Sequence, residues 1–496
     1  MSTQKRLQPA DREFFHLVSD AAACNPFGDR YAGLLQAIAG CDASVGYDEC
    51  LERLVARVDE RVRRLEEAGA ANVKHFDGDE RRIVCDALLF DIYWQFMASF
   101  DRLIEQQVES GERSLPVPFA REVLAALARR GFAAEEATRY LAIFYQIRRA
   151  FFFIDHQLVG RSPCMQELRR HLWNNVFTCD MRLYERHLWD RMEDFSTLLL
   201  GETGTGKGAA ATSIGRSGFI PFDEKKGCFA ESFMRSFIAL NLSQFAETLI
   251  ESELFGHRKG AFTGAVDIHE GVFARCSRHG AIFLDEIGDV TTPVQIKLLQ
   301  VLQDRTFSPV GSHEKQRFRG RVIAATNRPL DALRRGGQFR DDFFYRLCSD
   351  VIVVPPLRQR IQEAPQDLDD LIAVTVARMT GGPSEDVVAI VAAVVDSTCR
   401  GYGWPGNVRE LEQAVRRIVL TRAYGGDTRE PAPDLSGRLQ AGIADGSIDA
   451  DGLLGGYCRL LYDRHGTYEA VARRTRLDRR TVKAYIDRTS VAGRSR

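Results

Sequence analysis

The sequence predicts a central α/β domain with a helical lid, a helical region before it and a small basic helical unit after it. A glycine-rich loop that starts at Gly201 stands between an apolar strand and a helix-compatible stretch, as in α/β phosphate sites. A second apolar run ends in the adjacent acids Asp285 and Glu286. Upstream, apolar residues recur at spacings of three and four in segments 87–106 and 136–157, which indicates amphipathic helices.

The domain boundaries follow from changes in composition. We expect a helical regulatory domain over 1–157 and an α/β domain over 158–423, in which short apolar strands alternate with helices and a lid begins at about 362. Residues 424–455 are rich in Gly, Pro, Asp and Ser and are expected to be a linker. The remaining residues, 456–496, form the basic unit. A chain of 496 residues suits roughly three domains.

Composition excludes several classes of protein. A hydrophobic share of 45% with 27% charged residues is that of a folded protein and not of a disordered one. The apolar run 387–395 is shorter than the ~20 residues that cross a bilayer. The first residues lack the apolar core of a signal peptide, and the eleven cysteines form no CxxC pair. We therefore expect a cytoplasmic protein without a membrane partner, a disulfide framework or a zinc site.

Charge is distributed unevenly along the chain. The formal net charge is −1, yet 456–496 contains eleven Lys and Arg against four Asp and Glu, a net charge of +7. The rest of the chain must then sum to −8. A basic tail of this kind suits contact with nucleic acid.

The glycine-rich loop is interpreted as a phosphate-binding loop. It comprises Gly201, Glu202, Thr203, Gly204, Thr205, Gly206, Lys207 and Gly208. Its backbone N–H groups would surround phosphates, and Lys207 would place a charge near the β- and γ-phosphates. A plain glycine-rich turn is the alternative, which the strand before the loop and the helix after it disfavour. Gly208 stands where Ser or Thr usually reaches Mg²⁺.

The two acids are the candidate hydrolytic residues. Asp285 would hold Mg²⁺, through water, and Glu286 would orient and polarise the attacking water. The strand 322–325 ends near Asn327, which could sense the γ-phosphate. An exposed acidic strand end and a turn-forming asparagine are the alternatives.

Further motifs resemble a known family. The strings ESELFGH (251–257), GAFTGA (260–265), FLDEIGD, ATNR and WPGNVREL are similar to those of sigma-54-dependent transcription activators, the NtrC-type enhancer-binding proteins within the AAA+ ATPases. The resemblance extends from about 159 to 422. It implies that the chain binds ATP and Mg²⁺, assembles into a ring, expected to be a hexamer, binds double-stranded DNA upstream of promoters and remodels the sigma-54 RNA polymerase holoenzyme.

The GAFTGA string is the expected sigma-54 contact. It consists of Gly260, Ala261, Phe262, Thr263, Gly264 and Ala265. Small residues on both sides of Phe262 and Thr263 cannot build a core, so a mobile loop with an aromatic tip is expected. The resemblance makes Phe262 and Thr263 the contact residues. A plain hairpin turn is the alternative.

The resemblance assigns four further residues. Asn241 would be the switch asparagine that holds Glu286. Arg340 and Arg346 would reach the nucleotide of a neighbouring subunit, where a guanidinium stabilises phosphoryl charge. Arg409 would sense nucleotide within its own subunit. Surface arginines without such a role are the alternative.

The chain departs from the family in three places. Gly208 replaces a common glutamate, and insertions are expected near 173–195 and 222–236. All three are expected to lie near the nucleotide site or its entry, and to bear on the rate of ATP hydrolysis or on its regulation.

The tail is similar to the Fis-type helix-turn-helix. A first helix over 467–474, a turn over 475–477 and a second helix over 479–488 capped by Asp478 are expected. The expected DNA contacts are Arg479, Arg480, Thr481 and Lys483. A basic solvated helical tail is the alternative.

The sequence is compatible with two functions. The first is an ATP-hydrolysing activator of sigma-54 transcription. The alternative is a DNA-binding regulator that keeps the AAA+ fold without engaging sigma-54, which Gly208 favours. An AAA+ helicase or protease is less compatible with the GAFTGA string beside a helix-turn-helix.

Overall fold

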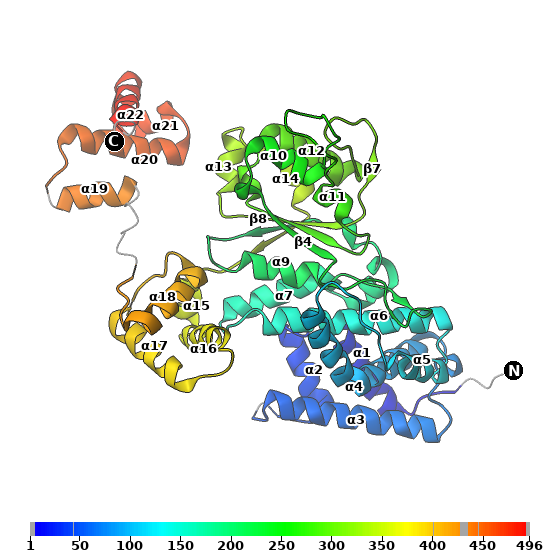
Figure 1. Ribbon diagram of the computed structural model, residues 1–496. Helices are drawn as coiled ribbons and strands as arrows, with labels where there is room; N and C mark the ends of the chain where they lie inside the picture. The colour runs from blue at the N-terminus through cyan, green and yellow to red at the C-terminus, as the bar shows by residue number, and fades with distance from the viewer. Residues whose placement is uncertain (1–4, 43, 400, 427–434, 445, 493–496) are drawn as a thin grey trace. The chain divides into compact units, whose positions relative to one another are not determined.

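A computed structural model describes residues 5–42, 44–399, 401–426, 435–444 and 446–492. The chain divides into two compact units, 1–423 and 424–496 (Figure 1). The first unit holds the N-terminal helices, the α/β domain and its lid. The second holds the basic tail.

The N-terminal part of the first unit is helical. Its helices are α1 (Pro9–Ala23), α2 (Asp29–Ala39), α3 (Tyr47–Glu67), α4 (Gly78–Ser110), α5 (Ala120–Arg129) and α6 (Ala134–Phe151), with short turns η1 (Val73–His75) and η2 (Phe152–His156). Apolar side chains on one face of each helix meet in a shared core, as the spacing of three and four predicts. Turn η2 is π-helical.

Helix α4 is the one helix in the described ranges that is long and apolar enough to cross a membrane. Its most apolar window is 44% buried by the surrounding chain. Leu88, Ile92 and Phe100 have no exposed surface and pack in the N-terminal core. These contacts are those of the core helix of a folded domain.

The α/β domain is built on a parallel sheet. Within the described chain the sheet has five strands in the order β4–β5–β8–β1–β9. The strands are β1 (Thr197–Leu200), β4 (Phe237–Asn241), β5 (Ala281–Asp285), β8 (Arg321–Thr326) and β9 (Asp350–Val353). Strand β1 lies between β8 and β9, with Leu199 opposite Ala325 and Ile352. Parallel strands bring their carboxyl ends to one edge, which is where such sheets bind ligands.

Helices cover both faces of this sheet (Figure 1). One face packs against α7 (Pro163–Phe177) and α9 (Lys207–Gly215), and the other against α10 to α14. Alternation along β5 divides its side chains between the faces, because Ile282 and Leu284 join one core and Ala281 and Phe283 the other. The second layer comprises α10 (Glu247–Phe255), α11 (Val272–Arg275), α12 (Thr292–Asp304), α13 (Leu330–Arg335) and α14 (Asp341–Leu347).

Shorter elements connect these layers. They are α8 (Met181–Leu183), η3 (Tyr184–Leu188), η4 (Met192–Asp194), β2 (Phe222–Asp223), β3 (Cys228–Phe229), η5 (Leu242–Gln244), η6 (Ile287–Asp289), β6 (Thr306–Phe307) and β7 (Gln316–Arg317). The lid follows the sheet and consists of α15 (Leu357–Glu363), α16 (Gln366–Thr380), α17 (Glu385–Thr398) and α18 (Asn407–Thr421).

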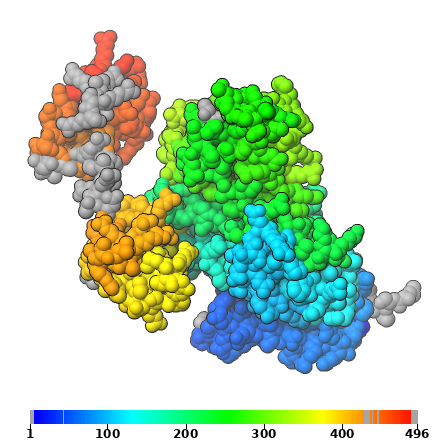
Figure 2. Space-filling view, in the orientation of Figure 1, coloured from blue at the N-terminus to red at the C-terminus, as the bar shows by residue number. Residues whose placement is uncertain are grey.

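The N-terminal helices lie directly against the α/β domain (Figure 2). Gln146 of α6 donates from Nε2 to the carbonyl oxygen of Ser217 at 2.9 Å, just beyond the end of α9. Arg149, which is buried, donates to the carbonyl oxygens of Arg216 and Gly218, both at 2.7 Å. The two parts of the unit are therefore joined by buried polar contacts as well as by apolar packing.

Both expected insertions take part in this contact. Tyr184, from the first, is buried and donates from Oη to Oε1 of Gln146 at 2.8 Å. Phe229, from the second, stacks on Tyr145 with ring centroids 3.9 Å apart. Neither insertion lines the cavity at the phosphate loop. The expectation that they lie at the nucleotide site is thus wrong, because their aromatic residues are buried against the N-terminal helices.

The second unit is a helical bundle. It contains α19 (Leu435–Ala444), α20 (Ala450–His465), α21 (Tyr468–Thr475) and α22 (Arg479–Ala492). Cys458, Leu461, Val471, Val482 and Ile486 form its core. The stretch 424–455, expected to be a linker, includes α19 and the start of α20, while residues 427–434 and 445 within it lie outside the described ranges.

Candidate nucleotide site

A cavity of about 470 Å³ lies where the phosphate loop, the acidic strand end and the lid meet. Its lining includes residues 203–209 of the loop, Asp285, Glu286 and, from the lid, Arg409. Asn241 also lines it, whereas Gly201, Glu202 and Asn327 are not part of the lining. The topology therefore gathers most of the sequence-predicted nucleotide residues into one place.

The phosphate loop joins β1 to α9. Lys207 is the first residue of α9, and its Nζ donates to the carbonyl oxygens of Gly201 at 2.9 Å and Glu202 at 3.1 Å. Burial lowers the pKa of Lys207, while Glu286 and Asp285 act in the opposite direction. Gly204 adopts a φ of +81°, and a Cβ there would stand 2.3 Å from the carbonyl oxygen of Gly406. Only glycine fits this approach of loop and lid.

The acids terminate β5. Glu286 has a φ of +57°, a left-handed conformation that glutamate rarely adopts and that is typical of functional sites. Burial raises the pKa of Glu286, and the neighbouring Asp285 raises it further, while Lys207 lowers it. A carboxyl with a raised pKa is better suited to accept a proton from water than an ordinary glutamate.

The two asparagines have different surroundings. Asn327 donates from Nδ2 to Oγ1 of Thr203 at 2.7 Å, and its backbone N–H donates to Oε2 of Glu286 at 3.4 Å. It therefore bridges the phosphate loop and the acid. Asn241 accepts at Oδ1 from the N–H and the hydroxyl of Ser243, at 3.0 and 2.7 Å, and so caps η5. The structure brings Asn241 into the cavity lining, with its side chain engaged by Ser243.

The lid is hydrogen-bonded to the phosphate loop. Asn407 is buried, and its Nδ2 donates to the carbonyl oxygen of Thr203 at 3.1 Å and to Oε2 of Glu202 at 3.2 Å. The N–H of Val408 donates to the carbonyl oxygen of Gly204 at 3.0 Å. Arg358 forms two hydrogen bonds to the Glu202 carboxylate, which hold the pKa of that carboxyl below its usual range.

Sequence reasoning missed Asn407 and Arg358. From the motif WPGNVREL, only Arg409 was singled out on the basis of the sequence. In the structure Asn407 has a φ of +54°, is completely buried and bonds the lid to the phosphate loop. Arg358 had no sequence signal, because its partner Glu202 is 156 residues away.

Apolar side chains form another part of the cavity lining, namely Leu158, Val159, Met165, Leu168 and Leu371. Gly160, beside it, has a φ of +133°, and a Cβ there would stand 2.6 Å from both Arg360 Nη2 and Asp367 Oδ2. The buried Arg360 and Asp367 are paired at 3.1 Å. A flat apolar group and a chain of phosphates thus have separate places within one cavity.

The cavity also fits a divalent cation beside phosphates. Asp285 and Glu286 supply carboxylate oxygens, the donors that Mg²⁺ prefers. Among the described residues no group of three metal-ligating side chains is present. A Mg²⁺ ion would therefore be held by Asp285, directly or through water, together with phosphate oxygens and water. Gly208 adds no ligand, and the space around its Cα is open.

Arg340 and Arg346 lie outside the cavity lining. Arg340 is the N-cap of α14, and its guanidinium pairs with Asp342 at 2.6 Å. Arg346 donates from Nε to the carbonyl oxygen of Leu302 at 2.9 Å. Among the described residues, neither guanidinium bonds to a group that lines the cavity of its own chain, so neither is placed to act there.

The GAFTGA string forms the turn of a short hairpin. His257 and His269 exchange both backbone hydrogen bonds at its base, and the N–H of Ala265 donates to the carbonyl oxygen of Phe262 at 3.0 Å at its tip. The Phe262 ring packs edge-on against His257 and is 37% exposed. Val266 and Ile268 are 68% and 67% exposed. Sequence reasoning missed these two, although their alternation with Asp267 could have indicated an exposed apolar edge.

In the tail, helices α21 and α22 are joined by a short turn. Asp478 accepts at Oδ1 from the N–H of Arg480 at 2.8 Å and caps α22. Arg480, Thr481 and Lys483 are exposed on the first turns of that helix. Arg479 is exposed too, and it pairs with Glu469 of α21 at 3.0 Å. The three-residue turn is closed by Arg476 at a φ of +56°.

Comparison with known proteins assigns the central part of the chain. Residues 183–353 match the family described as the sigma-54 interaction domain. This range contains the phosphate loop, both acids, the hairpin, and Arg340 and Arg346.

Curated relatives match over a longer stretch. The Nif-specific regulatory protein of Azotobacter vinelandii is 38% identical over 314 residues, which is 61% of this chain and 53% of the relative. The regulator NtrC of Azospirillum brasilense is 38% identical over 262 residues, 53% of this chain and 47% of the relative. The chain thus spans about half the length of these relatives. A crystal structure of NtrX from Brucella abortus with ATP is 21% identical, covers 74% of this chain and 80% of its own, and has a TM-score of 0.41.

Proposed function

We propose, from the premise that residues 183–353 belong to the sigma-54 interaction domain family of enhancer-binding activators, that this protein hydrolyses ATP to remodel sigma-54 RNA polymerase holoenzyme. It would act in the cytoplasm, from DNA upstream of its promoters. The observation that carries the proposal is the single cavity in which Lys207, Asp285, Glu286 and Arg409 meet.

ATP fits this cavity in one orientation. Its phosphates would lie on the backbone N–H groups of the loop, with the Lys207 ammonium beside the β- and γ-phosphates. Its base would lie at the apolar part of the lining, between Val159 and Leu371. Arg409 and the hydrogen bonds of Asn407 would then make the position of the lid depend on the nucleotide.

Hydrolysis is assigned to Glu286. Its raised pKa and its place beside Asp285 suit a group that orients water and receives its proton. Mg²⁺, when bound, neutralises charge on the transferring phosphoryl group. Asn327 would report the γ-phosphate, because it contacts both Thr203 and Glu286.

Assembly would complete the site. Because Arg340 and Arg346 lie outside the cavity of their own chain, we assign them to the nucleotide of a neighbouring subunit in a ring, expected to be a hexamer. ATPase activity per subunit should then rise with protein concentration. Arg340→Ala and Arg346→Ala should each remove this rise while ATP binding persists, and an unchanged rise in either variant would contradict the role of that arginine.

The hairpin and the tail are the proposed partner contacts. Phe262 and Thr263 would meet sigma-54 at the tip, and the exposed Val266 and Ile268 extend that apolar surface. Arg480, Thr481 and Lys483 would enter a DNA groove from the start of α22. Arg479 is assigned to DNA as well. On binding, its guanidinium would leave the Glu469 carboxylate and pair with a DNA phosphate.

The direct test of the enzyme is Glu286→Ala. We expect this variant to bind ATP with near-normal affinity and to lose turnover, because Lys207 and the loop are unaltered. Asp289→Ala, which changes an exposed carboxylate near the same strand end, is the matched control. Normal turnover in Glu286→Ala would contradict the assignment.

A regulator that does not act as a motor is the second candidate. Gly208 favours it, because the open space at this position holds no oxygen for the metal. The same Glu286→Ala experiment separates the two functions. In a regulator of the second kind, DNA binding and promoter output would be identical in wild type and variant.

A further inference from the structure

A second cavity, of about 600 Å³, lies away from the nucleotide site, between the N-terminal helices and the α/β domain. Helices α1, α3, α4 and α6 supply most of its wall, and Trp173, Met181, Arg182 and Glu185 close it from the α/β domain. Its volume lies in the range of cavities that take small molecules. Its lining includes neither the phosphate loop nor Asp285 and Glu286.

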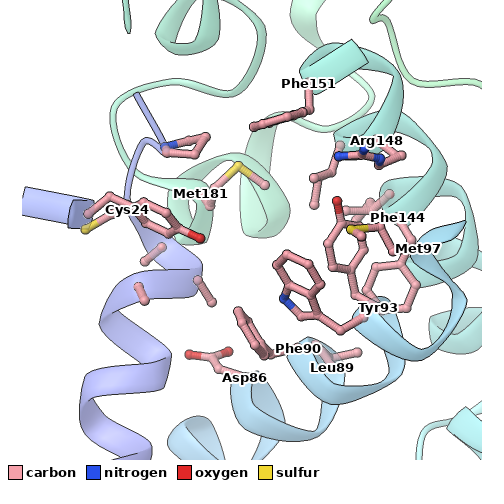
Figure 3. Close-up of a pocket in the computed structure, with 18 of the residues that line it drawn as sticks. Cys24, Asp86, Leu89, Phe90, Tyr93, Met97, Phe144, Arg148, Phe151 and Met181 are labelled. Carbon is pink, nitrogen blue, oxygen red and sulfur yellow. The ribbon is translucent and has the colours of Figure 1, made fainter. Parts of the chain in front are cut away.

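The wall is largely aromatic. Figure 3 shows Phe90, Tyr93 and Met97 of α4 and Phe144 and Phe151 of α6 around the cavity. The other aromatic residues of the lining are Phe27, Tyr31, Tyr47, Trp94, Tyr140 and Trp173. Such rings offer flat faces for stacking at little cost in side-chain entropy. A ring compound therefore matches the wall better than an extended polar molecule.

Two donors in this wall lack an acceptor. Within the described residues, the indole nitrogens of Trp94 and Trp173 are buried and have no hydrogen-bond partner. Unsatisfied buried donors are uncommon, and each is costly. A carbonyl or ether oxygen of a ligand could accept from either N–H once its ring turns toward the cavity.

The charges in the wall exclude an anionic ligand. Arg148 forms two hydrogen bonds to Asp101, and Arg182 pairs with Asp20 at 2.9 Å, so both arginines in the wall are neutralised. The wall also contains Asp48, Asp86, Asp155 and Glu185.

Two of these acids are engaged as well. Asp86 accepts a hydrogen bond from Ser19 at 2.5 Å, and Glu185 accepts one from Tyr140 at 2.5 Å. With both arginines and these two acids partnered, a neutral ligand fits best.

The cavity is connected to the phosphate loop through two segments. Helix α6 lines the cavity with Phe144 and Arg148, and in the same turns Gln146 and Arg149 hold the end of α9, whose first residue is Lys207. Arg182 donates to the carbonyl oxygen of Ser19 at 2.8 Å, and its segment leads into β1. A ligand that moved α6 would therefore displace the helix that carries Lys207.

We propose that this cavity binds neutral, mainly apolar ring compounds that carry a hydrogen-bond acceptor, and that its occupancy sets the ATPase rate. The binding of a ligand does not depend on ATPase activity. The control of the ATPase rate rests on the proposed function.

Prodan, a neutral naphthalene ketone, is the probe for the test. With the full chain and without nucleotide, we expect a saturable blue shift of its emission at one site per chain. Acetylnaphthalene should displace it, and naphthoate, with a carboxylate on the same ring, should not. A shift that never saturates, or equal displacement by both compounds, would overturn the binding proposal.

Two variants locate the probe. Met97→Trp fills the cavity and should weaken prodan binding at least about tenfold, whereas Met379→Trp, the same change on the exposed face of α16, should leave it unaltered. Trp94→Phe keeps a ring but removes the donor, and should weaken binding about three- to tenfold. Wild-type affinity in both cavity variants, with folding verified by circular dichroism, would overturn the proposal.

The motor is then tested separately. Saturating prodan should change the ATPase rate of wild type and not that of Met97→Trp. Saturable binding with an unchanged ATPase rate would overturn the coupling alone. A wild-type protein without ATPase activity at any protein concentration would contradict the proposed function and leave the binding result standing.

Discussion

Asn407 of the lid donates a hydrogen bond to the carbonyl oxygen of Thr203 in the phosphate loop at 3.1 Å. The lid helix α18 begins at this residue, so the helix and the loop cannot separate without breaking a buried contact. The phosphate loop and the lid are thereby joined through one side chain, which also donates to the Glu202 carboxylate at 3.2 Å.

Asn407→Ala should weaken ATP binding and lower the free energy of unfolding by about 1–3 kcal/mol, because the backbone N–H of Leu357 loses its buried acceptor. Calorimetric ATP titration and thermal unfolding measure the two effects. Asn72→Ala, which removes a cap in the N-terminal helices, should lower stability without changing ATP affinity. Wild-type ATP affinity in Asn407→Ala would contradict the coupling of lid and loop.

Gly208→Thr should raise ATP turnover at limiting Mg²⁺. The open space at Gly208 accepts a side chain, and a threonine hydroxyl there would supply a metal ligand. Gly208→Val has the same shape without the oxygen and is the control. Titrating Mg²⁺ in the ATPase assay distinguishes them, and equal curves for the two variants would rule out a metal-binding role for this position.

Asp86→Asn should stabilise the protein at neutral pH. Burial raises the pKa of Asp86 to about 6, against the ordinary 3.8, with Ser19 and two arginines opposing and Glu185 adding to the shift. The folded state therefore favours the protonated carboxyl. This contribution to stability is present below pH about 4 and is lost as pH rises through about 6.

The variant should remove this loss, which amounts to roughly 1–3 kcal/mol of unfolding free energy at pH 7. Urea unfolding at pH 4 and pH 7 measures it. We expect the wild type to lose stability between these values relative to Asp86→Asn. Parallel pH dependence in the two proteins would refute the burial of an ionised Asp86.

Arg476→Gly should stabilise the turn between α21 and α22 by about 0.5–1 kcal/mol, because glycine adopts a φ of +56° without strain. Hydrogen exchange of α21 and α22 in the full chain gives the local free energy. Arg474→Gly, the same change within α21, should lower it by about 1 kcal/mol. A loss of protection in Arg476→Gly would show that the left-handed turn is not formed.

The parts of the site that could be predicted from the sequence are those formed by short contiguous motifs. The phosphate loop follows one strand and the two acids end another, so the parallel sheet brings them together without further information. Their immediate strand context was enough to place Lys207 and Glu286 in one cavity.

Other parts depend on contacts between distant segments. Asn407 and Glu202 are 205 residues apart, and no local sequence pattern predicts their hydrogen bond. The aromatic cavity draws its wall from several helices whose rings look, in sequence, like ordinary core. The two insertions were predicted beside the nucleotide site, because a sequence does not show that Tyr184 and Phe229 are buried against the N-terminal helices.

The measurement that tests the central claim most directly is open-complex formation by sigma-54 holoenzyme on a promoter with the upstream site. Wild type with ATP should open the promoter, Glu286→Ala should not, and Thr263→Ala should hydrolyse ATP without opening it. Thr263→Ser, which keeps the hydroxyl, should retain opening. ATP hydrolysis by wild type without opening, or wild-type opening by Thr263→Ala, would contradict the account.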